Sequence, residues 1–177
     1  MAAFVWTPAG PRPLDELLQG RQTWREEGRV VVSTNGCFDL LHPGHVRFLQ
    51  QARSQGDLLI VGLNSDDSVR RLKGPDRPLR SQEDRAAMLA ALRCVDEVVV
   101  FEEVRANELL ARLRPDIHCK GGDYIAEDLP EAEVIRRGGG QIRILPFSPG
   151  YSTTGLVEAI RTGQPGASEG TSPARAG

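Results

Sequence analysis

Residues 29–53 read RVVVSTNGCFDLLHPGHVRFLQQAR, and this stretch decides the fold. Its first part, Val30–Thr34, is a short apolar run of the kind that forms a buried β-strand. Its last part, Pro43–Arg53, has apolar residues at helical spacing and begins with a proline, which suits a first helical turn. A strand, a glycine-containing turn and a helix in this order predict one strand–helix unit of an α/β protein.

The same alternation continues along the chain. Further apolar runs predict strands at Asp57–Leu63, Asp96–Phe101, Asp116–Lys120 and Gln141–Leu145. Helical patterns lie at Ser81–Leu92, Asn107–Leu113, Glu131–Arg137 and Thr153–Arg161. In the first of these, Ser81 is the candidate N-cap, and Met88, Leu89 and Leu92 are expected to face the core. Continuous apolar strands separated by helices are typical of a parallel sheet covered on both faces. We therefore expect an α/β, Rossmann-like, doubly wound parallel sheet of about five strands with helices on both faces.

The length of 177 residues fits one domain of ordinary size. We assign residues 29–162 to that domain. Residues 1–28 form an extension, in which residues 12–27 are expected to be a helix packed on the domain. Residues 163–177, GQPGASEGTSPARAG, have almost no large apolar side chains and are predicted to be a disordered tail.

Composition excludes several classes of function. The net charge of −2 gives no basic field that would attract nucleic acid. No apolar run is long enough to span a membrane, and the N-terminus does not resemble a signal peptide. The three cysteines form no CxxC pair and suit free thiols in a reducing compartment. We therefore expect a cytoplasmic protein with neither a nucleic-acid nor a membrane partner.

The segment TNGCFDLLHPGH, residues 34–45, is the best candidate for a chemical site. It contains neither of the two common glycine-rich nucleotide motifs, but a strand end followed by a helix start presents backbone N–H groups to an anion. His42 and His45 lie three residues apart, so both can share one helix face and donate to phosphate oxygens. Fixed donors of this kind stabilise the charge that develops in nucleotidyl transfer, with Mg²⁺ bridging the phosphate oxygens.

Two other interpretations of this segment are weaker. A metal site built from Cys37, Asp39, His42 and His45 has suitable ligand types, but a single strand-to-helix turn rarely brings four ligands together. A nucleophilic Cys37 would need a base and an oxyanion hole of its own. We therefore predict no protein metal site and interpret Cys37 as a small packing residue.

HPGH after a first strand, with Ser-Thr-Thr near the end of the chain, resembles the HxGH nucleotidyltransferase superfamily, which includes cytidylyltransferases and adenylyltransferases. Within it, the chain is most similar to the D-glycero-β-D-manno-heptose-1-phosphate adenylyltransferases. The similarity extends over roughly residues 29–161. The blocks that carry it, in order, are TNGCFDLLHPGH (34–45), VGLNSDDSVRRLKG (61–74), RP (77–78), CKGGDY (119–124) and YSTTGL (151–156).

The resemblance implies a role for each matching residue. His42, His45 and Lys73 would be catalytic, the histidines by contacting the triphosphate and Lys73 as a point charge in a loop flanked by glycine and proline. Besides the two histidines, the implied nucleotide-binding residues are Thr34, Gly36, Cys37, Phe38, Lys120, Gly121, Asp123, Ser152, Thr153 and Thr154. The implied acceptor-binding residues are Asn35, Asp39, Asn64, Lys73 and Arg85, of which Arg85 would either pair with phosphate or brace the site.

The resemblance also implies the reaction. AMP would pass from ATP to a sugar 1-phosphate, D-glycero-β-D-manno-heptose 1-phosphate, with Mg²⁺ as cofactor. The products would be pyrophosphate and ADP-heptose, and the ADP-heptose would serve either lipopolysaccharide biosynthesis or the synthesis of secondary-metabolite glycosides. A sugar kinase acting earlier in the pathway would be a separate protein, and a homodimer is common among similar proteins.

Two alternatives stay open. One is a cytidylyltransferase that acts on an alcohol phosphate such as glycerol 3-phosphate. Glycerol-phosphate cytidylyltransferases carry an arginine five residues before the serine of the last motif, where this chain has Phe147, and this difference favours ATP. The other is a non-catalytic nucleotide-binding module, since a fold does not fix a function. A degenerate copy would be expected to lose His42, His45 or Lys73, yet all three are present.

Overall fold

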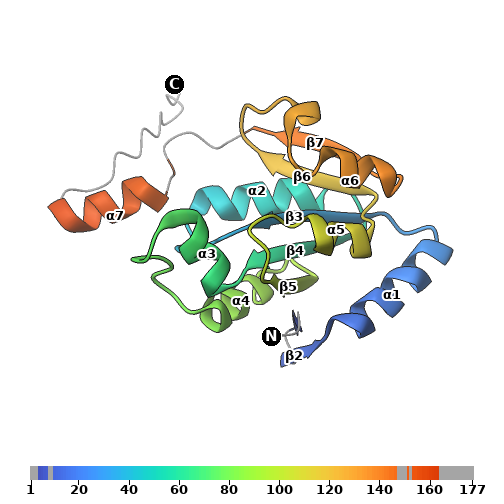
Figure 1. Cartoon of the computed structure of the whole chain (residues 1–177), viewed down its shortest axis with the longest axis horizontal. Coiled ribbons are helices and arrows are strands. Elements are labelled where there is room, and N and C mark those ends of the chain that lie inside the picture. The colour runs from blue at the N-terminus through green and yellow to red at the C-terminus, as the bar shows by residue number, and fades with distance from the viewer. Residues whose placement is uncertain (1–3, 8–9, 147–150, 152, 164–177) are drawn as a thin grey trace, which may run out of the picture.

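The computed structural model of this chain describes residues 4–7, 10–146, 151 and 153–163. Within these residues, a seven-stranded sheet with the order β2-β1-β5-β4-β3-β6-β7 lies between two layers of helices (Figure 1). The five strands β3 to β7 are parallel to one another. They are β3 (Val31–Gly36), β4 (Leu58–Asn64), β5 (Glu97–Phe101), β6 (Ile117–Gly121) and β7 (Gln141–Leu145). The predicted Rossmann-like parallel sheet is therefore confirmed.

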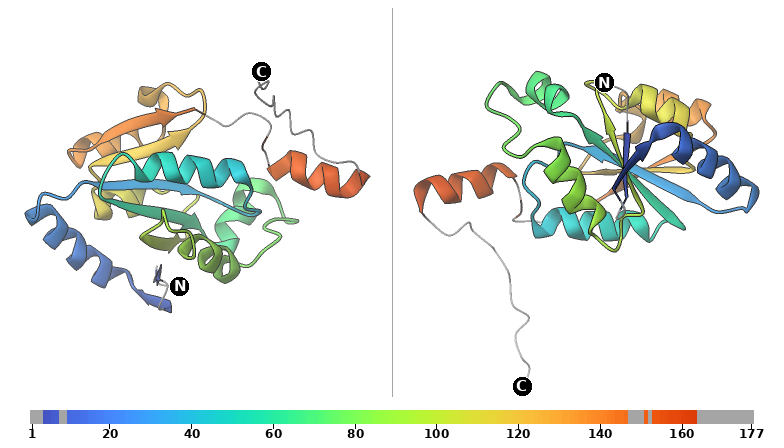
Figure 2. Two further views of the ribbon diagram at one scale, coloured as in Figure 1. Left: turned by 180° about the vertical axis from the view of Figure 1, so that it is seen from behind. Right: turned by 90° about the horizontal axis from the view of Figure 1, so that it is seen from below.

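The two helical layers each bury an apolar face against the sheet. On one face lie α2 (Pro43–Arg53) and α4 (Gln82–Ala90); on the other lie α1 (Leu14–Glu26), α5 (Asn107–Leu113) and α6 (Ala132–Arg137) (Figure 2). Leu49 of α2 and Leu110 of α5 are almost fully buried on opposite sides of the sheet. Burying a leucine side chain contributes roughly 2 kcal/mol, so both layers hold the sheet in place.

Two short strands at the N-terminal end enlarge the sheet beyond the predicted five. β1 (Phe4–Thr7) pairs antiparallel with β5, and β2 (Gly10–Pro13) pairs antiparallel with β1. β2 reads GPRP, and prolines cannot donate to a strand ladder, so this sequence does not predict a strand and is tolerated only at an edge.

A helix between β4 and α4 was also missed. This helix, α3 (Asp66–Lys73), begins at the side-chain cap of Ser65 and ends at Gly74, whose φ of +97° favours glycine. Lys73, which the sequence analysis placed in a loop, is thus the last residue of a helix. The remaining elements are the short 3₁₀ helix η1 (Ala126–Asp128) and α7 (Thr153–Thr162), which stands out from the body of the sheet near the start of α2 (Figures 1 and 2).

One prediction about helix orientation is wrong. Met88 was expected on the core side of α4 together with Leu89, but Met88 is 39% exposed and Leu89 is fully buried. The helix instead turns Ala86 and Leu89 inward, and Arg85 fills the space beside them.

The extension is tied to the domain by a half-buried ion pair. Arg21 of α1 donates to Asp116 Oδ1 at 2.9 Å and to the carbonyl of Arg114 at 2.9 Å. The other carboxylate oxygen of Asp116 accepts from the Val31 N–H at the start of β3. The predicted tail lies largely outside the described residues, since these end at 163. In the part of the chain that is described, every helix is too short or too polar to cross a membrane.

Gly140 provides a test of the packing between α6 and β7. A Cβ at this position would lie 2.3 Å from the carbonyl oxygen of Pro115, which precedes β6. We expect Gly140→Ala to lower the free energy of unfolding by about 1–3 kcal/mol, because the backbone must shift to relieve the clash. Urea denaturation followed by circular dichroism measures the change.

Gly20→Ala is the matched control. Gly20 lies within α1, and its added methyl would meet Trp24 at an ordinary distance of 3.6 Å. Alanine is the better helix former by about 1 kcal/mol, so this variant should be as stable as the parent or more so. Equal unfolding midpoints for the two variants would contradict the close packing at Gly140.

Candidate active site

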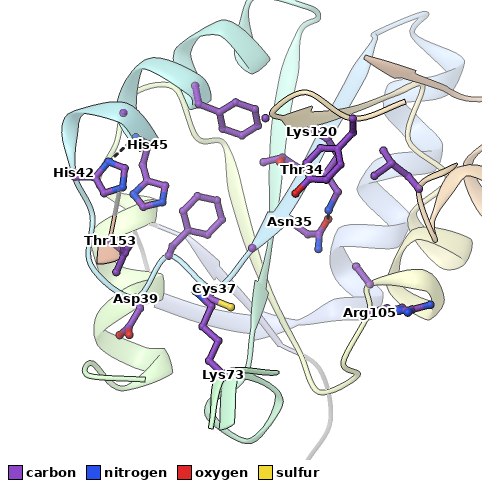
Figure 3. Close-up of a pocket in the computed structure, with 18 of the residues that line it drawn as sticks. Thr34, Asn35, Cys37, Asp39, His42, His45, Lys73, Arg105, Lys120 and Thr153 are labelled. Carbon is purple, nitrogen blue, oxygen red and sulfur yellow. Dashed lines mark hydrogen bonds between the residues drawn. The ribbon is translucent and has the colours of Figure 1, made fainter. Parts of the chain in front are cut away.

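A cavity of about 890 Å³ opens where β3 and β6 end (Figure 3). Strand order reverses at β3, because β4 and β5 lie on one side of it and β6 and β7 on the other. Parallel α/β sheets bind their ligands at this point, and the volume suits a nucleotide. The side chains that line the cavity come from the α2 face of the sheet and also from the α5–α6 face.

A sharp turn after β3 brings the HPGH motif to the cavity. Phe38 has a φ of +46°, a left-handed conformation that is uncommon outside glycine, and its ring lies 5.3 Å from that of His45. His42 caps α2, and its Nδ1 accepts from the His45 N–H at 3.3 Å. The two imidazole rings are stacked with centroids 3.8 Å apart. The predicted sharing of one helix face by the histidines is confirmed.

Both histidines are uncharged near neutral pH. Burial lowers the pKa of His42 below its usual value. Burial, together with the charges of His42 and Lys73, lowers the pKa of His45 to about 4. Since Nδ1 of His42 accepts a hydrogen bond, its proton lies on Nε2. The pair therefore offers neutral N–H donors to a ligand.

The last motif lies against the start of α2. A Cβ on Gly44 would come within 2.8 Å of Tyr151 Cβ, so glycine allows the two segments to touch. The Arg47 guanidinium lies 5.0 Å from the centre of the Tyr151 ring. Thr153 and Thr154, at the start of α7, line the cavity as predicted, whereas Ser152 lies outside the described residues.

Lys73 is a cation of the cavity lining that lies near His45. It extends into the cavity from the end of α3 and forms no hydrogen bond or ion pair with another described residue (Figure 3). Its charge is close enough to lower the pKa of His45. A lysine that is free in this position can contact a phosphate.

Asp39 lines the cavity, but its oxygens are already engaged. It accepts from Arg77 at 2.7 Å and from the backbone N–H groups of Leu79 and Arg80. Burial acts to raise the pKa of this carboxyl, but these hydrogen bonds hold it below its usual value. Asp39 thus anchors the segment after α3, and its contact with an acceptor stays a prediction.

Arg85 and Asn64 lie outside the cavity lining. Arg85 is fully buried and donates to the carbonyls of Cys37 and Arg80 and to the Asp66 carboxylate. Of the two roles considered for it, the structure favours bracing. Asn64 is also buried and donates to Ser68 Oγ at 2.8 Å.

The remaining predicted nucleotide residues mostly converge on the cavity. Thr34, Gly36, Cys37, Lys120 and Gly121 line it, as does Phe38, whereas Asp123 is exposed and does not. Lys120 Nζ donates to Asn35 Oδ1 at 2.9 Å.

Sequence reasoning missed part of the lining. These residues follow β5 and β6 on the α5–α6 face, and among them only Tyr124 lies in a motif block, CKGGDY. They are Arg105, Ala106, Tyr124, Leu129, Pro130 and Glu131.

Metal and nucleophile interpretations of the HPGH segment find no support. Among the described residues, no group of three or more His, Cys, Asp and Glu side chains could hold a metal ion. Burial raises the pKa of the Cys37 thiol above its usual value, although Lys73 and Arg85 act against this. The thiol is therefore protonated and a poor nucleophile.

Comparison with known proteins agrees with this geometry. Residues 33–158 match the family model described as cytidylyltransferase-like. The chain is 54% identical over 136 residues to the bifunctional protein HldE of Syntrophotalea carbinolica, covering 77% of this chain and 28% of that protein. It is 45% identical over 156 residues to the bifunctional protein HldE of Hyphomonas neptunium, covering 88% of this chain and 32% of the relative. The chain thus spans less than a third of the length of these relatives.

A solved structure is also similar. The lipopolysaccharide core biosynthesis protein from Thermoplasma volcanium superposes with a TM-score of 0.55 at 29% identity, over 68% of this chain and 97% of that one. The matched family region includes most of β3, the HPGH turn, Lys73 and the start of α7, all of which contribute to the cavity. The chain therefore belongs to the cytidylyltransferase-like family.

Proposed function

We propose that this protein is a nucleotidyltransferase that transfers AMP from ATP to a sugar 1-phosphate, with D-glycero-β-D-manno-heptose 1-phosphate as the acceptor. The products would be ADP-heptose and pyrophosphate. The observation that carries the proposal is the stacked, neutral pair of His42 and His45 beside the unpaired Lys73, at the switch point of the sheet. Similarity to a lipopolysaccharide core biosynthesis protein supports a sugar acceptor.

The proposed reaction is a single displacement at phosphorus. An oxygen of the acceptor phosphate forms a bond to the α-phosphorus of ATP while the bond to the pyrophosphate oxygen breaks. Negative charge increases on the α-phosphate oxygens and on the leaving group, and fixed donors stabilise that charge. His42 supplies its Nε2–H, the first turns of α2 and α7 supply backbone N–H groups, and Lys73 supplies a positive charge.

Magnesium would enter this site with the nucleotide. The described residues offer no cluster of three ligands, and the cavity carboxylate of Asp39 is held by Arg77 and backbone N–H groups. Such a donor set fits an ion held by the phosphate oxygens themselves. When bound, Mg²⁺ would neutralise part of the triphosphate charge.

The acceptor implies a partner reaction. A sugar 1-phosphate must be supplied by a reaction that phosphorylates a sugar, so we include a sugar kinase in the proposed pathway. Cys37, Cys94 and Cys119 are free thiols, which is consistent with the proposed cytoplasmic location. A homodimer is part of the proposal as well.

His45→Ala tests the histidine pair. Loss of a donor that stabilises the transition state should lower kcat by roughly a hundredfold, equivalent to about 3 kcal/mol. Pyrophosphate release with ATP, Mg²⁺ and heptose 1-phosphate measures the rate. His45→Asn, which retains a side-chain N–H donor, should recover part of the loss. Normal turnover by the alanine variant would remove His45 from the catalytic residues.

Lys73→Met tests the unpaired cation. The substitution keeps the length of the side chain but removes the charge beside the phosphates, so kcat/KM should fall by at least about tenfold. Arg70→Met is the control, since Arg70 lies on the same helix, pairs with Asp67 and does not line the cavity. Full activity of the Lys73 variant, or equal losses in both variants, would contradict a phosphate role for Lys73.

The nucleotide is tested by comparing ATP with CTP. The similarity in CKGGDY and YSTTGL favours ATP, as does Phe147, although that residue lies outside those the structure describes. We expect kcat/KM for ATP to exceed that for CTP by at least tenfold, or about 1.4 kcal/mol of differential transition-state binding. The measurement uses heptose 1-phosphate and, in parallel, glycerol 3-phosphate as acceptors. A preference for CTP, or activity only with glycerol 3-phosphate, would overturn the assignment.

A further inference from the structure

A chain of polar side chains crosses the sheet on the α5–α6 face, opposite the histidine pair. Ser33 Oγ and His118 Nδ1 lie 2.8 Å apart, and His118 Nε2 lies 3.6 Å from Glu131 Oε1. The same carboxylate oxygen lies 2.6 Å from Lys120 Nζ, which in turn donates to Asn35 Oδ1. The chain thus begins in the core and ends in the cavity.

Burial makes this arrangement costly unless every member is paired. His118 is fully buried, and Glu131 is only 6% exposed although it borders the cavity. Burial lowers the pKa of His118, so the ring is neutral. Burial acts to raise the pKa of Glu131, but the nearby His118 ring and the Lys120 ammonium lower it to about 2. Glu131 is therefore a buried anion that Lys120 neutralises, and apolar residues would fill this space at lower cost.

The pairing leaves defined donors for a ligand. A lysine ammonium has three N–H donors, and contacts to Asn35 and Glu131 engage two of those on Lys120. The oxygen of Asn35 accepts from Lys120, which leaves the Asn35 NH₂ group available. Both residues line the cavity, and Figure 3 shows them together on the side away from His42.

Charge divides the cavity into two ends. At one end, Lys73 is unpaired among the described residues, and two helices begin there. At the other end, Glu131 cancels the positive charge of Lys120, and Arg105 lies exposed on the same α5–α6 face. Phosphates favour the first end, whereas the charge-neutralised donors of Lys120 and Asn35 suit the hydroxyls of a sugar ring. Such hydroxyls belong either to the ribose of the nucleotide or to the acceptor sugar.

We propose that Glu131 is a positioning residue, which together with His118 fixes the Lys120 ammonium beside Asn35 so that this pair binds sugar hydroxyl groups. This inference rests on the proposed function, whose substrates provide both kinds of sugar. It adds a second recognition site to the cavity, separate from the phosphate contacts of His42, His45 and Lys73. Glu131 touches neither substrate in this proposal and acts through Lys120.

A double-mutant cycle tests the action through Lys120. Glu131→Gln preserves the shape of the side chain but removes its charge, and should lower kcat/KM roughly tenfold, as expected for residues in contact. In a Lys120→Met background the same substitution should have almost no further effect. Glu133→Gln, on the exposed side of α6, is the control and should leave kcat/KM unchanged. The same fold-loss with and without Lys120 would overturn the proposal.

Deoxy substrates identify the sugar. If the pair binds ribose, replacing ATP by 2′-deoxy-ATP or 3′-deoxy-ATP should raise KM in the parent protein but not in Lys120→Met. If it binds the acceptor, a deoxy sugar 1-phosphate should behave this way instead. A merely structural Glu131 would leave both discriminations intact in Glu131→Gln. The proposal would also be contradicted if Lys120→Met still distinguished every normal substrate from its deoxy analogue as the parent protein does.

Stability and binding measurements separate the possible failures. Thermal unfolding shows whether each variant folds. If Glu131→Gln does not fold, Glu131→Asp, which keeps the charge but shortens the side chain, replaces it in the double-mutant cycle. If the parent releases no pyrophosphate with any sugar phosphate, the proposed function has failed. In that case the double-mutant cycle is repeated with binding affinities, which calorimetric titration measures for ATP and separately for the sugar 1-phosphate. The cycle then gives the coupling energy between Glu131 and Lys120. Additive losses in affinity for both ligands would overturn the inference independently.

Discussion

The buried guanidinium of Arg85 is the interaction on which the catalytic edge of the sheet depends. Loops at the ends of parallel strands have no ladder to hold them, and here one side chain from α4 binds two of them together with the segment that precedes α4. Arg85 donates to the Cys37 carbonyl after β3, to the Arg80 carbonyl, and to the Asp66 carboxylate at the start of α3. A buried cation without partners would cost several kcal/mol, so the three segments and Arg85 fix one another. His42, His45 and Lys73 all lie on segments held in this way.

The cavity built on this frame has different charged and polar groups on its two faces. Neutral imidazoles and an unpaired lysine lie on the α2 face, whereas a neutralised lysine and an amide lie on the α5–α6 face. Each face is reached from β3, whose alternate residues point to opposite sides of the sheet. Consecutive positions such as Thr34 and Asn35 can therefore serve different parts of the cavity.

Local patterns predicted whatever depends on neighbouring residues. The bounds of α2 and α5 agree with the prediction, as does the cap of α4 at Ser81, because spacing, proline and capping residues are all local signals. Contacts between segments distant in the sequence could not be predicted from these local signals. Glu131 looked like the start of an ordinary helix, but in the structure it pairs with Lys120, which the pairing of β3 with β6 places beside Asn35. Asp39 lines the cavity whereas Arg85 lies outside its lining, and their bracing contacts join residues that are 40 and 48 positions apart.

The neutrality of the histidines constrains how the site would hold the proposed substrates. A triphosphate and a sugar phosphate together bring several negative charges, yet the pKa of His45, about 4, leaves that ring uncharged near neutral pH. Among the described residues that line the cavity, Lys73 and the exposed Arg105 are the cations without an ion pair. The charges of Lys73 and Arg105, together with the N-termini of two helices, do not offset that excess of negative charge. The proposed Mg²⁺ on the triphosphate would supply the missing positive charge. The histidines would then orient the phosphate, because a neutral N–H donor favours one oxygen without binding the whole phosphate group tightly in the ground state.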